Sequence, residues 1–447
     1  MPESAVQVGI VGMGTVGAGV ARVLVESADR MASRAGRPVV LKRAVVRDLE
    51  RDRGVTLPAG ILTDDVAAII NDPEIELAIH LVGGLEPARQ IMVDLLKSGK
   101  DVVTANKALL CEHGPELFGL ARELGRTIAF EAAVAGGIPI IATMATCLTA
   151  NQILSITAIL NGTSNFILSQ MDREGWSYAD ALKKAQELGF AEADPTFDVD
   201  GTDAAQKLVL LTQLGFGMRV PLETFPRSGI NRLELADLRC ADMFDCVVKL
   251  LATAKLAGGK LELHVQPTLV PKTSPLASIH GSFNAIRVVG DVVGETWYSG
   301  QGAGQSPTAS AVLADLIDSV IGRTRLTFYR LAPWQDTARL PLQSEDDAEA
   351  RFYLRLHVED RPNVLAEICD ALGRNSISIA SVIQEEAAEP EETGGTSDSN
   401  RSEETPVVPL VIMTHKTTVG RIRAAEARFA ELGSVRPGHC RMPVADL

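Results

Sequence analysis

The sequence has few aromatic residues, little positive charge and no long apolar run. Phe, Trp and Tyr make up 4% of the 447 residues, so the cores must be built from aliphatic side chains. A net charge of −14 disfavours nucleic acid and anionic membrane surfaces as partners, because both need clustered Lys and Arg. No apolar stretch reaches the roughly 18–20 residues of a membrane-spanning helix. The N-terminus also lacks the charged, apolar and small-residue layout of a signal peptide.

Cysteine and histidine are scattered along the chain. The six cysteines form no CxxC motif, and the seven histidines form no HExxH pair. In a chain of this length, scattered cysteines favour reduced thiols in the cytoplasm over a disulfide framework. The same dispersal disfavours a transition-metal site.

The first part of the chain alternates between strand and helix patterns. Strands are expected at 6–11, 39–46, 75–82 and 101–104, and helices at 16–28 and 87–98. Such alternation predicts βαβ units with a parallel sheet, and therefore an α/β Rossmann-type domain. We expect this nucleotide-binding domain at 1–145, completed by a helix near 305–330.

The pattern changes from residue 151 onward. Strands are expected at 153–160, 261–270 and 285–292, and helices at 178–188, 203–214 and 308–321. We interpret 146–304 as an α+β domain for substrate binding and dimerisation, with a mostly antiparallel sheet.

A Pro- and acid-rich linker at 332–349 precedes a last module at 350–447. Strands at 352–358, 377–383 and 407–414, helices at 363–372 and 419–432, and a short final strand give the order βαββαβ. This order predicts a ferredoxin-like sandwich. The segment 385–404 carries eight acidic residues and one Arg, which predicts a solvated, mobile insert.

A glycine-rich turn follows the first strand and opens a helix. Its residues are Gly12, Met13, Gly14, Thr15, Val16 and Gly17. The glycines permit a tight turn and close approach of a pyrophosphate, and the helix N-terminus supplies free N–H groups. An ordinary tight βα turn is the alternative, but the strand before and the helix after favour dinucleotide binding.

The end of the second strand bears on which dinucleotide binds. An NAD site places a carboxylate there for the ribose 2′-hydroxyl. Here Arg47 is the first side chain past the strand and suits a 2′-phosphate. We therefore predict NADP, while Asp48 beside it keeps NAD open. A surface ion pair between the two is the other interpretation.

The densest group of carboxylates lies between residues 192 and 203. Five acidic residues occupy these twelve positions, and Lys207 follows one helical turn after Asp203. Asp194-Pro195 disfavours a helix and indicates a structured loop. Oxidising an alcohol by hydride loss needs a base, and a lysine can serve if burial or a second cation lowers its pKa. A solvated acidic loop beside an ordinary helix salt bridge is the alternative.

With Gly189, Asp194-Pro195, Asp198, Gly201, Asp203 and Lys207, the segment 185–207 resembles homoserine dehydrogenase. The resemblance covers roughly residues 5–330. It implies interconversion of L-homoserine and L-aspartate 4-semialdehyde, with Lys207 as proton donor or acceptor. It also implies that Glu192, Asp198 and Asp203 bind substrate.

Further motifs resemble the same family. Val103-Thr104-Ala105-Asn106-Lys107 follows a strand, and its lysine would approach cofactor and substrate, so the expected catalytic residues are Lys207, Lys107 and Asp203. The stretch 160–165 would lie beside the substrate. Further cofactor contacts are expected at Gly83, Lys107, Gly189, Gly302 and Gly304. Without the resemblance, these segments would be ordinary turns and helix starts.

A glycine-bent segment near residue 131 offers oxygen ligands. Glu131 and the carbonyls of Val134, Gly136 and Ile138 correspond by resemblance to a sodium-type site, and oxygen atoms suit such a hard cation. From the residues alone, a bent connection between a strand and a helix explains the glycines.

The loop 360–365 of the last module looks like the ligand loop of ACT domains, which bind amino acids at paired interfaces. This resemblance covers roughly 350–435 and implies threonine as an effector and a homodimer or homotetramer. Asn363 replaces the usual Gly but tolerates left-handed backbone. A purely structural dimerisation module is the alternative.

Two other functions remain open at this point. One is a different amino-acid or sugar dehydrogenase on the same nucleotide fold, which should lack the Asp203–Lys207 pairing in this loop. The other is a non-catalytic NADP-linked amino-acid sensor in which the last module does the work.

Overall fold

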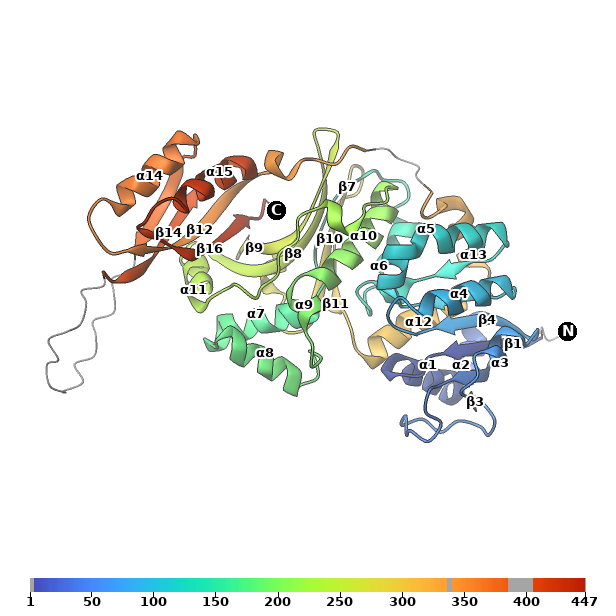
Figure 1. Cartoon of the computed structure of the whole chain (residues 1–447). Coiled ribbons are helices and arrows are strands. Elements are labelled where there is room, and N and C mark those ends of the chain that lie inside the picture. Colours follow the sequence, from blue (N-terminus) through green and yellow to red (C-terminus); the bar gives the residue numbers. More distant parts are fainter. Residues whose placement is uncertain (1–3, 336–339, 385–404, 447) are drawn as a thin grey trace, which may run out of the picture.

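The computed structural model describes residues 4–335, 340–384 and 405–446. Three parts follow one another in a row: a parallel sheet with its helices at the N-terminal end, a large sheet in the middle, and a smaller module at the C-terminal end (Figure 1). Among the described residues, no helix combines the length and apolar character needed to cross a membrane.

The first sheet has six strands, all parallel, in the order β3-β2-β1-β4-β5-β6. They are β1 (Val6–Val11), β2 (Val39–Val45), β3 (Leu62–Thr63), β4 (Ile75–His80), β5 (Asp101–Thr104) and β6 (Ile128–Ala129). The order reverses between β1 and β4, and ligands of such sheets bind outside the strand ends at this point. The predicted Rossmann-type fold is confirmed.

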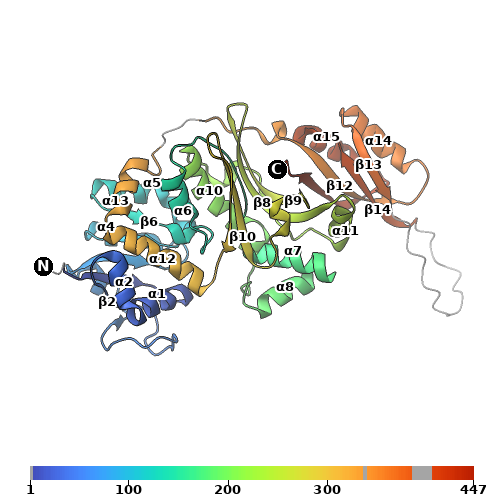
Figure 2. The ribbon, with the colours of Figure 1, turned by 180° about the vertical axis from the view of Figure 1, so that it is seen from behind.

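Helices pack on both faces of this sheet. They are α1 (Thr15–Glu26), α2 (Ala28–Ala35), α3 (Ala67–Ile70), α4 (Ala88–Lys97) and α5 (Lys107–Glu123), joined from later in the chain by α12 (Gln305–Val320) and α13 (Arg323–Leu331). The single helix predicted at 16–28 is wrong in its end: α1 stops at Glu26, and α2 begins two residues later. Helix α12 lies against α1 (Figure 2), where a β-carbon on Gly19 would come within 2.8 Å of Gln305.

The second sheet runs β11-β10-β7-β8-β9-β16-β12-β14-β13. Its first five strands are β7 (Ile153–Ile159), β8 (Cys246–Ala257), β9 (Lys260–Pro271), β10 (Phe283–Gly290) and β11 (Gly294–Gln301), all antiparallel. The mostly antiparallel sheet is confirmed, although β8 and β11 were not predicted. Its helices are α6 (Ile140–Ala142), α7 (Gly162–Glu174), α8 (Tyr178–Glu187), α9 (Thr196–Val199), α10 (Thr202–Phe216) and α11 (Leu235–Met243).

The C-terminal module has the predicted order βαββαβ. It contains β12 (Glu349–Glu359), α14 (Val364–Arg374), β13 (Ile379–Gln384), β14 (Val407–Thr414), the short β15 (Thr417–Thr418), α15 (Val419–Phe429) and β16 (Val435–Val444). The final strand was expected to be short, but it spans 10 residues because it pairs along most of β12. It also joins the middle sheet through Val444 and Leu269. The predicted acidic insert at 385–404 lies outside the described residues.

The linker predicted at 332–349 is anchored where the structure describes it. Trp334 is buried and its ring stacks on Phe118 at 4.2 Å. Further on, the N–H of Leu261 donates to Pro341, and the N–H of Gln343 donates to Leu261. The segment therefore packs on α5 of the first domain and on β9 of the second sheet.

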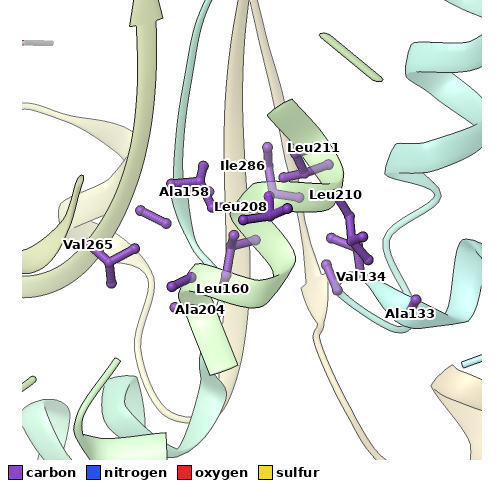
Figure 3. Packing of buried hydrophobic residues seen from close by; sticks show 14 of the residues in the cluster. Ala133, Val134, Ala158, Leu160, Ala204, Leu208, Leu210, Leu211, Val265 and Ile286 are labelled. Carbon is purple, nitrogen blue, oxygen red and sulfur yellow. The ribbon is translucent and has the colours of Figure 1, made fainter. Parts of the chain in front are cut away.

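The core of the middle domain is aliphatic, as the low aromatic content predicts. Helix α10 presents buried Ala204, Leu208 and Leu211 to residues of β7, β9 and β10 (Figure 3). The other labelled members of this cluster are Ala133, Val134, Ala158, Leu160, Leu210, Val265 and Ile286. This packing holds α10 rigidly, which matters because its first two turns carry Asp203 and Lys207.

Candidate active site

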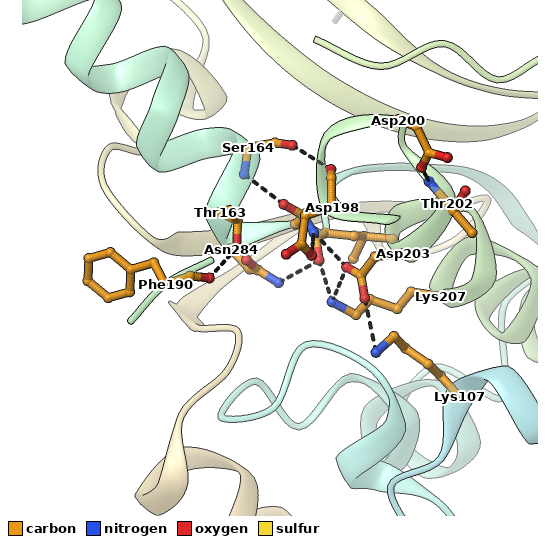
Figure 4. Close-up of polar contacts among 12 residues, drawn as sticks. Lys107, Thr163, Ser164, Phe190, Asp198, Asp200, Thr202, Asp203, Lys207 and Asn284 are labelled. Carbon is orange, nitrogen blue, oxygen red and sulfur yellow. Dashed lines mark hydrogen bonds and ion pairs between the residues drawn. The ribbon is translucent and has the colours of Figure 1, made fainter. Parts of the chain in front are cut away.

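Two lysines share one carboxylate where the two large domains meet. Nζ of Lys207 lies 2.7 Å from Oδ2 of Asp203, and Nζ of Lys107 lies 3.0 Å from Oδ1 of the same residue (Figure 4). Lys107 is the first residue of α5, whereas Asp203 and Lys207 stand one turn apart on α10. Packing of α5 on α10 thus unites residues 100 positions apart in sequence.

The local sequence aligns α10 for this contact. Gly201 precedes the helix with φ of 85°, a left-handed conformation that glycine adopts without strain. A β-carbon there would also press on Val265 and Arg227 at 3.2–3.3 Å. The i, i+4 spacing then places Asp203 and Lys207 on one face, as the sequence predicted.

Burial and charge give the two lysines different acidities. Burial lowers the pKa of Lys207, and the Lys107 ammonium lowers it further, while Asp203 opposes both. For Lys107 the charge of Asp203 outweighs burial and raises the pKa. Burial alone would raise the pKa of Asp203, but the two ammonium groups hold it well below its usual value. Lys107 therefore stays charged, and Lys207 is the easier of the two to deprotonate.

Lys207 has a second fixed contact, to the backbone. Its Nζ donates to the carbonyl of Leu160 at 2.7 Å, just past the end of β7. A lysine ammonium has three N–H donors, so Asp203 and Leu160 leave one for a substrate. Sequence reasoning did not include this carbonyl, because a backbone acceptor carries no residue-type signal.

Asn161 links the predicted carboxylates. Its Nδ2 donates to Asp198 at 2.8 Å and to Asp203 at 2.9 Å, while its Oδ1 caps α7 by accepting the N–H of Ser164. Burial, together with the charge of Asp203, raises the pKa of Asp198. The 160–165 stretch thus lies beside the predicted carboxylates, and Asn161 is its residue in contact with both acids.

Glu192 and Gly189 lie in the loop between α8 and α9, which is tied to α7 by the hydroxyl of Thr163 donating to Phe190. Both residues are exposed. Within the described part of the chain, the Glu192 carboxylate makes no hydrogen bond or ion pair, although its charge contributes to the raised pKa of Lys107. The structure thus brings Glu192 near the cluster without engaging it.

The glycine-rich turn joins β1 to α1 at the edge of the parallel sheet. Gly12 has φ of 99°, and a β-carbon there would lie 2.9 Å from the backbone of Leu81. A β-carbon on Gly17 would lie 2.3 Å from the carbonyl of Gly12. At Gly14, by contrast, it would meet nothing within 4 Å. The turn therefore has open space at the N-terminus of α1, where a pyrophosphate binds in this fold.

The segment Val103–Lys107 connects the glycine-rich edge of the parallel sheet to the two lysines. Asn106 caps α5 by accepting the N–H of Leu109, and its Nδ2 donates to the carbonyls of Val82 and Gly84. Lys107 follows Asn106 directly in the chain. Asn106 therefore fixes the loop after β4, which includes Gly83, and Lys107 contacts Asp203. The nucleotide edge and the lysine pair therefore belong to one site.

The two charged residues that follow β2, Arg47 and Asp48, have different surroundings. The Asp48 carboxylate accepts the N–H groups of Glu50 and Arg51 at 3.0 and 3.2 Å, forming a turn. Arg47 is exposed, and its side chain makes no hydrogen bond or ion pair within the residues that the structure describes. Arg53 donates to the carbonyls of Asp48 and Arg51 in the same loop.

Comparison with known proteins identifies the family. The family model "Homoserine dehydrogenase, NAD binding domain" matches residues 12–131, and "Homoserine dehydrogenase" matches 139–317. A homoserine dehydrogenase of Pseudomonas aeruginosa is 40% identical over 451 residues, covering 99% of each chain. The chain belongs to the homoserine dehydrogenase family.

Solved structures of this family agree. A homoserine dehydrogenase from Thiobacillus denitrificans has a TM-score of 0.89 at 40% identity, covering 99% of each chain. A hyperthermophilic archaeal homoserine dehydrogenase in complex with NADPH has a TM-score of 0.60 at 27% identity, covering 71% of this chain and 98% of that one. The predicted family is thus confirmed, as is the predicted class of NAD(P)-dependent oxidoreductase acting on a CH–OH group.

The homoserine dehydrogenase resemblance also implied a cation near Glu131. Ala135 and Gly136 both have positive φ, which turns this backbone sharply. The carbonyls of Val134 and Gly136 accept no hydrogen bond from the described residues, whereas that of Ile138 accepts the N–H of Ile140. The Glu131 carboxylate already accepts the N–H groups of Ile141 and Ala142. The carbonyls of Val134 and Gly136 are therefore available to a hard cation, while the Ile138 carbonyl and the Glu131 carboxylate already accept hydrogen bonds.

Gly302 and Gly304 lie between β11 and α12, next to the bent segment. A β-carbon on Gly136 would meet the carbonyl of Gly302 at 2.6 Å. Gln305, which follows, donates to the carbonyl of Thr15 in the glycine-rich turn at 3.0 Å. These glycines therefore border the cofactor edge that the homoserine dehydrogenase motifs predict.

Proposed function

We propose that the chain interconverts L-homoserine and L-aspartate 4-semialdehyde with NADP(H), and that Lys207 donates and accepts the proton. The observation that carries this proposal is that Lys107 and the buried Lys207 contact the same Asp203 carboxylate, an arrangement that lowers the pKa of Lys207 while Lys107 stays charged. In oxidation, the hydroxyl proton passes to Nζ of neutral Lys207. In reduction, the ammonium returns a proton to the aldehyde oxygen. The nicotinamide, when bound, supplies or takes the hydride.

The other polar residues then divide the remaining work. Asp203 holds both lysines, and Lys107 keeps a positive charge between the nucleotide edge and the substrate. Glu192 and Asp198 are the carboxylates best placed to receive the ammonium group of homoserine. Asp203 adds to that negative charge, although its oxygens are already taken by lysines and Asn161.

Preference for NADP is supported by the loop after β2. Asp48 spends its carboxylate on two backbone N–H groups, so it is poorly available to a ribose 2′-hydroxyl. Arg47 remains exposed and can pair with a 2′-phosphate. The expected result is a higher kcat/KM with NADPH than with NADH, reduced toward equality in Arg47→Ala. Equal values in the unchanged protein would remove the preference.

The activity itself is tested by absorbance at 340 nm with NADP and L-homoserine. Lys207→Ala should reduce kcat by about 10²-fold or more while leaving NADPH binding intact. An unchanged rate would refute the role of Lys207. A folded protein without turnover on either cofactor would refute the reaction, and would leave a sensor or a different dehydrogenase.

A monovalent cation such as sodium is proposed at the main-chain oxygens of Val134, Gly136 and Ile138, next to Glu131. It would stabilise the bend that packs on Gly302. The melting temperature in sodium chloride should then exceed that in choline chloride at equal ionic strength. Equal melting temperatures would contradict the proposal.

We propose that the C-terminal module is an ACT domain that takes threonine. Asn363 has φ of 76° at the start of α14, so the left-handed turn of the loop is retained despite the loss of glycine. Saturating L-threonine should lower the rate of homoserine oxidation. Unchanged kinetics would leave the module a structural role.

A homodimer or homotetramer is proposed from the edge of the middle sheet. Strand β11 ends the sheet order, and large apolar side chains near it are exposed: Phe283, Val292, Val293 and Trp297. Such a patch favours burial against a second copy. Light scattering on the purified protein tests this, and a monomer would refute it. A cytoplasmic location is proposed because the six cysteines are scattered along the chain, which favours reduced thiols over a disulfide framework.

A further inference from the structure

The Leu160 carbonyl that holds Lys207 also accepts a second donor. Asn284, at the start of β10, donates from Nδ2 to this oxygen at 3.1 Å (Figure 4). Lys207 donates to the same oxygen at 2.7 Å. Both lone pairs of the carbonyl are therefore engaged, and its direction is fixed by the amide on one side.

The Asn284 amide is itself clamped by the segment that follows β11. Asn284 is fully buried, and a β-carbon on Gly302 would lie only 2.1 Å from its Cγ. Gly302 leads into α12, where Gln305 contacts the glycine-rich turn at Thr15. The amide thus lies between the proton-transfer lysine and the segment that borders the cofactor edge.

The amide oxygen of Asn284 indicates that this residue does more than fill space in the core. Oδ1 of Asn284 is buried and has no hydrogen-bond partner within the described residues. A buried acceptor without a donor destabilises a fold, and a leucine of similar size would avoid that cost. The residue therefore carries a stability penalty while its Nδ2 serves one acceptor, the Leu160 carbonyl.

We infer that Asn284 is a positioning residue for proton transfer, an inference that rests on the proposed role of Lys207. By fixing the Leu160 carbonyl, Asn284 holds Nζ of Lys207 so that its remaining N–H points at the reacting oxygen of the substrate. Its contact with Gly302 fixes the position of Nζ of Lys207 relative to the cofactor edge. Asn284 touches neither proton nor hydride.

Asn284→Leu tests the inference, because it keeps the branched shape of the side chain and removes the donor. The expected result is a fall in kcat of about 10²-fold, the size of effect produced by misplacing a reacting group by about 1 Å. The KM values for homoserine and NADP should stay within about twofold, since fully buried Asn284 offers no exposed surface to either molecule. A kcat equal to that of the unchanged enzyme would overturn the inference.

Asn284→Asp supplies a rescue that a merely structural role would not produce. A protonated carboxyl can donate to the Leu160 carbonyl, whereas an ionised one repels that oxygen. In the reduction direction at low pH, kcat of Asn284→Asp should therefore exceed that of Asn284→Leu, and any decline should come as pH rises. An Asp variant no better than the Leu variant at any pH would contradict the proposal.

Asn151→Leu is the matched control. Asn151 holds the opposite end of the same strand pair, where it accepts the N–H of Val293 and packs on Gly290. This variant should lower the melting temperature without a selective loss of kcat. Lys207→Ala is measured in parallel: if it retains turnover, the proposed role of Lys207 fails. If it is inactive while Asn284→Leu is normal, only the present inference fails.

Discussion

Arg355 of β12 forms a fully buried, bidentate ion pair with Asp237 of α11. Nε lies 2.7 Å from Oδ1 and Nη2 lies 3.1 Å from Oδ2. The hydroxyl of Tyr353 also donates to Asp237 at 2.9 Å, and Glu234 pairs with Arg355 at the rim. The pair joins the C-terminal module to the middle domain, and α11 packs in turn on α7, which Asn161 caps.

Breaking this pair should loosen the module. Arg355→Met leaves the Asp237 charge buried and unpaired, which costs about 3–5 kcal/mol of unfolding free energy. Adding Asp237→Leu removes the stranded charge and should recover most of that loss. Thermal denaturation followed by circular dichroism measures both variants. If Arg355→Met were as stable as the unchanged protein, the ion pair would contribute nothing to the free energy of unfolding.

The pH dependence of homoserine oxidation should follow Lys207. Oxidation needs the neutral amine, so the rate should rise as pH increases through the pKa of Lys207, which burial places below the usual lysine value. Asp203→Asn removes the charge that opposes this lowering, so the rising limb should move to lower pH, alongside a smaller kcat. A limb that moves to higher pH would contradict the assignment.

Lys107→Met should move the rising limb of the pH profile of homoserine oxidation to higher pH. The Lys107 ammonium lowers the pKa of Lys207, and removing it leaves Asp203 to stabilise the charged amine. The limb in the kcat profile should therefore shift to higher pH. Arg22→Met, which removes a cation that contacts Gln305 and Gly54 rather than Asp203, serves as the control and should leave the limb in place. Identical limbs in all three proteins would exclude charge coupling between the lysines.

Two glycines of the dinucleotide turn should respond differently to alanine. At Gly14 a β-carbon meets only open space, so Gly14→Ala should fold normally but weaken NADPH binding by about tenfold, or about 1.4 kcal/mol. At Gly17 it would collide with the Gly12 carbonyl, which should destabilise the fold by about 1–3 kcal/mol. Fluorescence titration with NADPH and thermal denaturation separate the two effects. Equal binding in Gly14→Ala would place the pyrophosphate elsewhere.

The alternation of β1, β2, β4 and β5 with helices was predictable, because strands buried on both faces appear as continuous apolar runs. Strand β11 was not, since residues Gly294–Gln301 are mostly polar and exposed, and they form a strand only by pairing with β10. The final strand, β16, was predicted too short for the same reason, because it is extended by pairing with β12, which is far away in the sequence.

In the site, the Asp203–Lys207 pair was predictable from helical spacing alone, and family resemblance supplied Lys107. Asn284 was not predicted, because a single Asn at the start of a strand has no distinguishing pattern. Its importance depends on two contacts across 124 and 18 residues, to Leu160 and Gly302.

The sequence by itself determined the glycine-rich turn, the order of elements and the i, i+4 pair, because each depends on local backbone geometry and side-chain periodicity. Only the tertiary structure decided that Lys107 and Lys207 share one carboxylate and that, of these two, Lys207 has the lowered pKa. It also decided that Arg355 and Asp237 join the last module to the middle domain. Those outcomes depend on burial and on distances between segments far apart in the chain. Local sequence patterns predict neither the burial nor these distances.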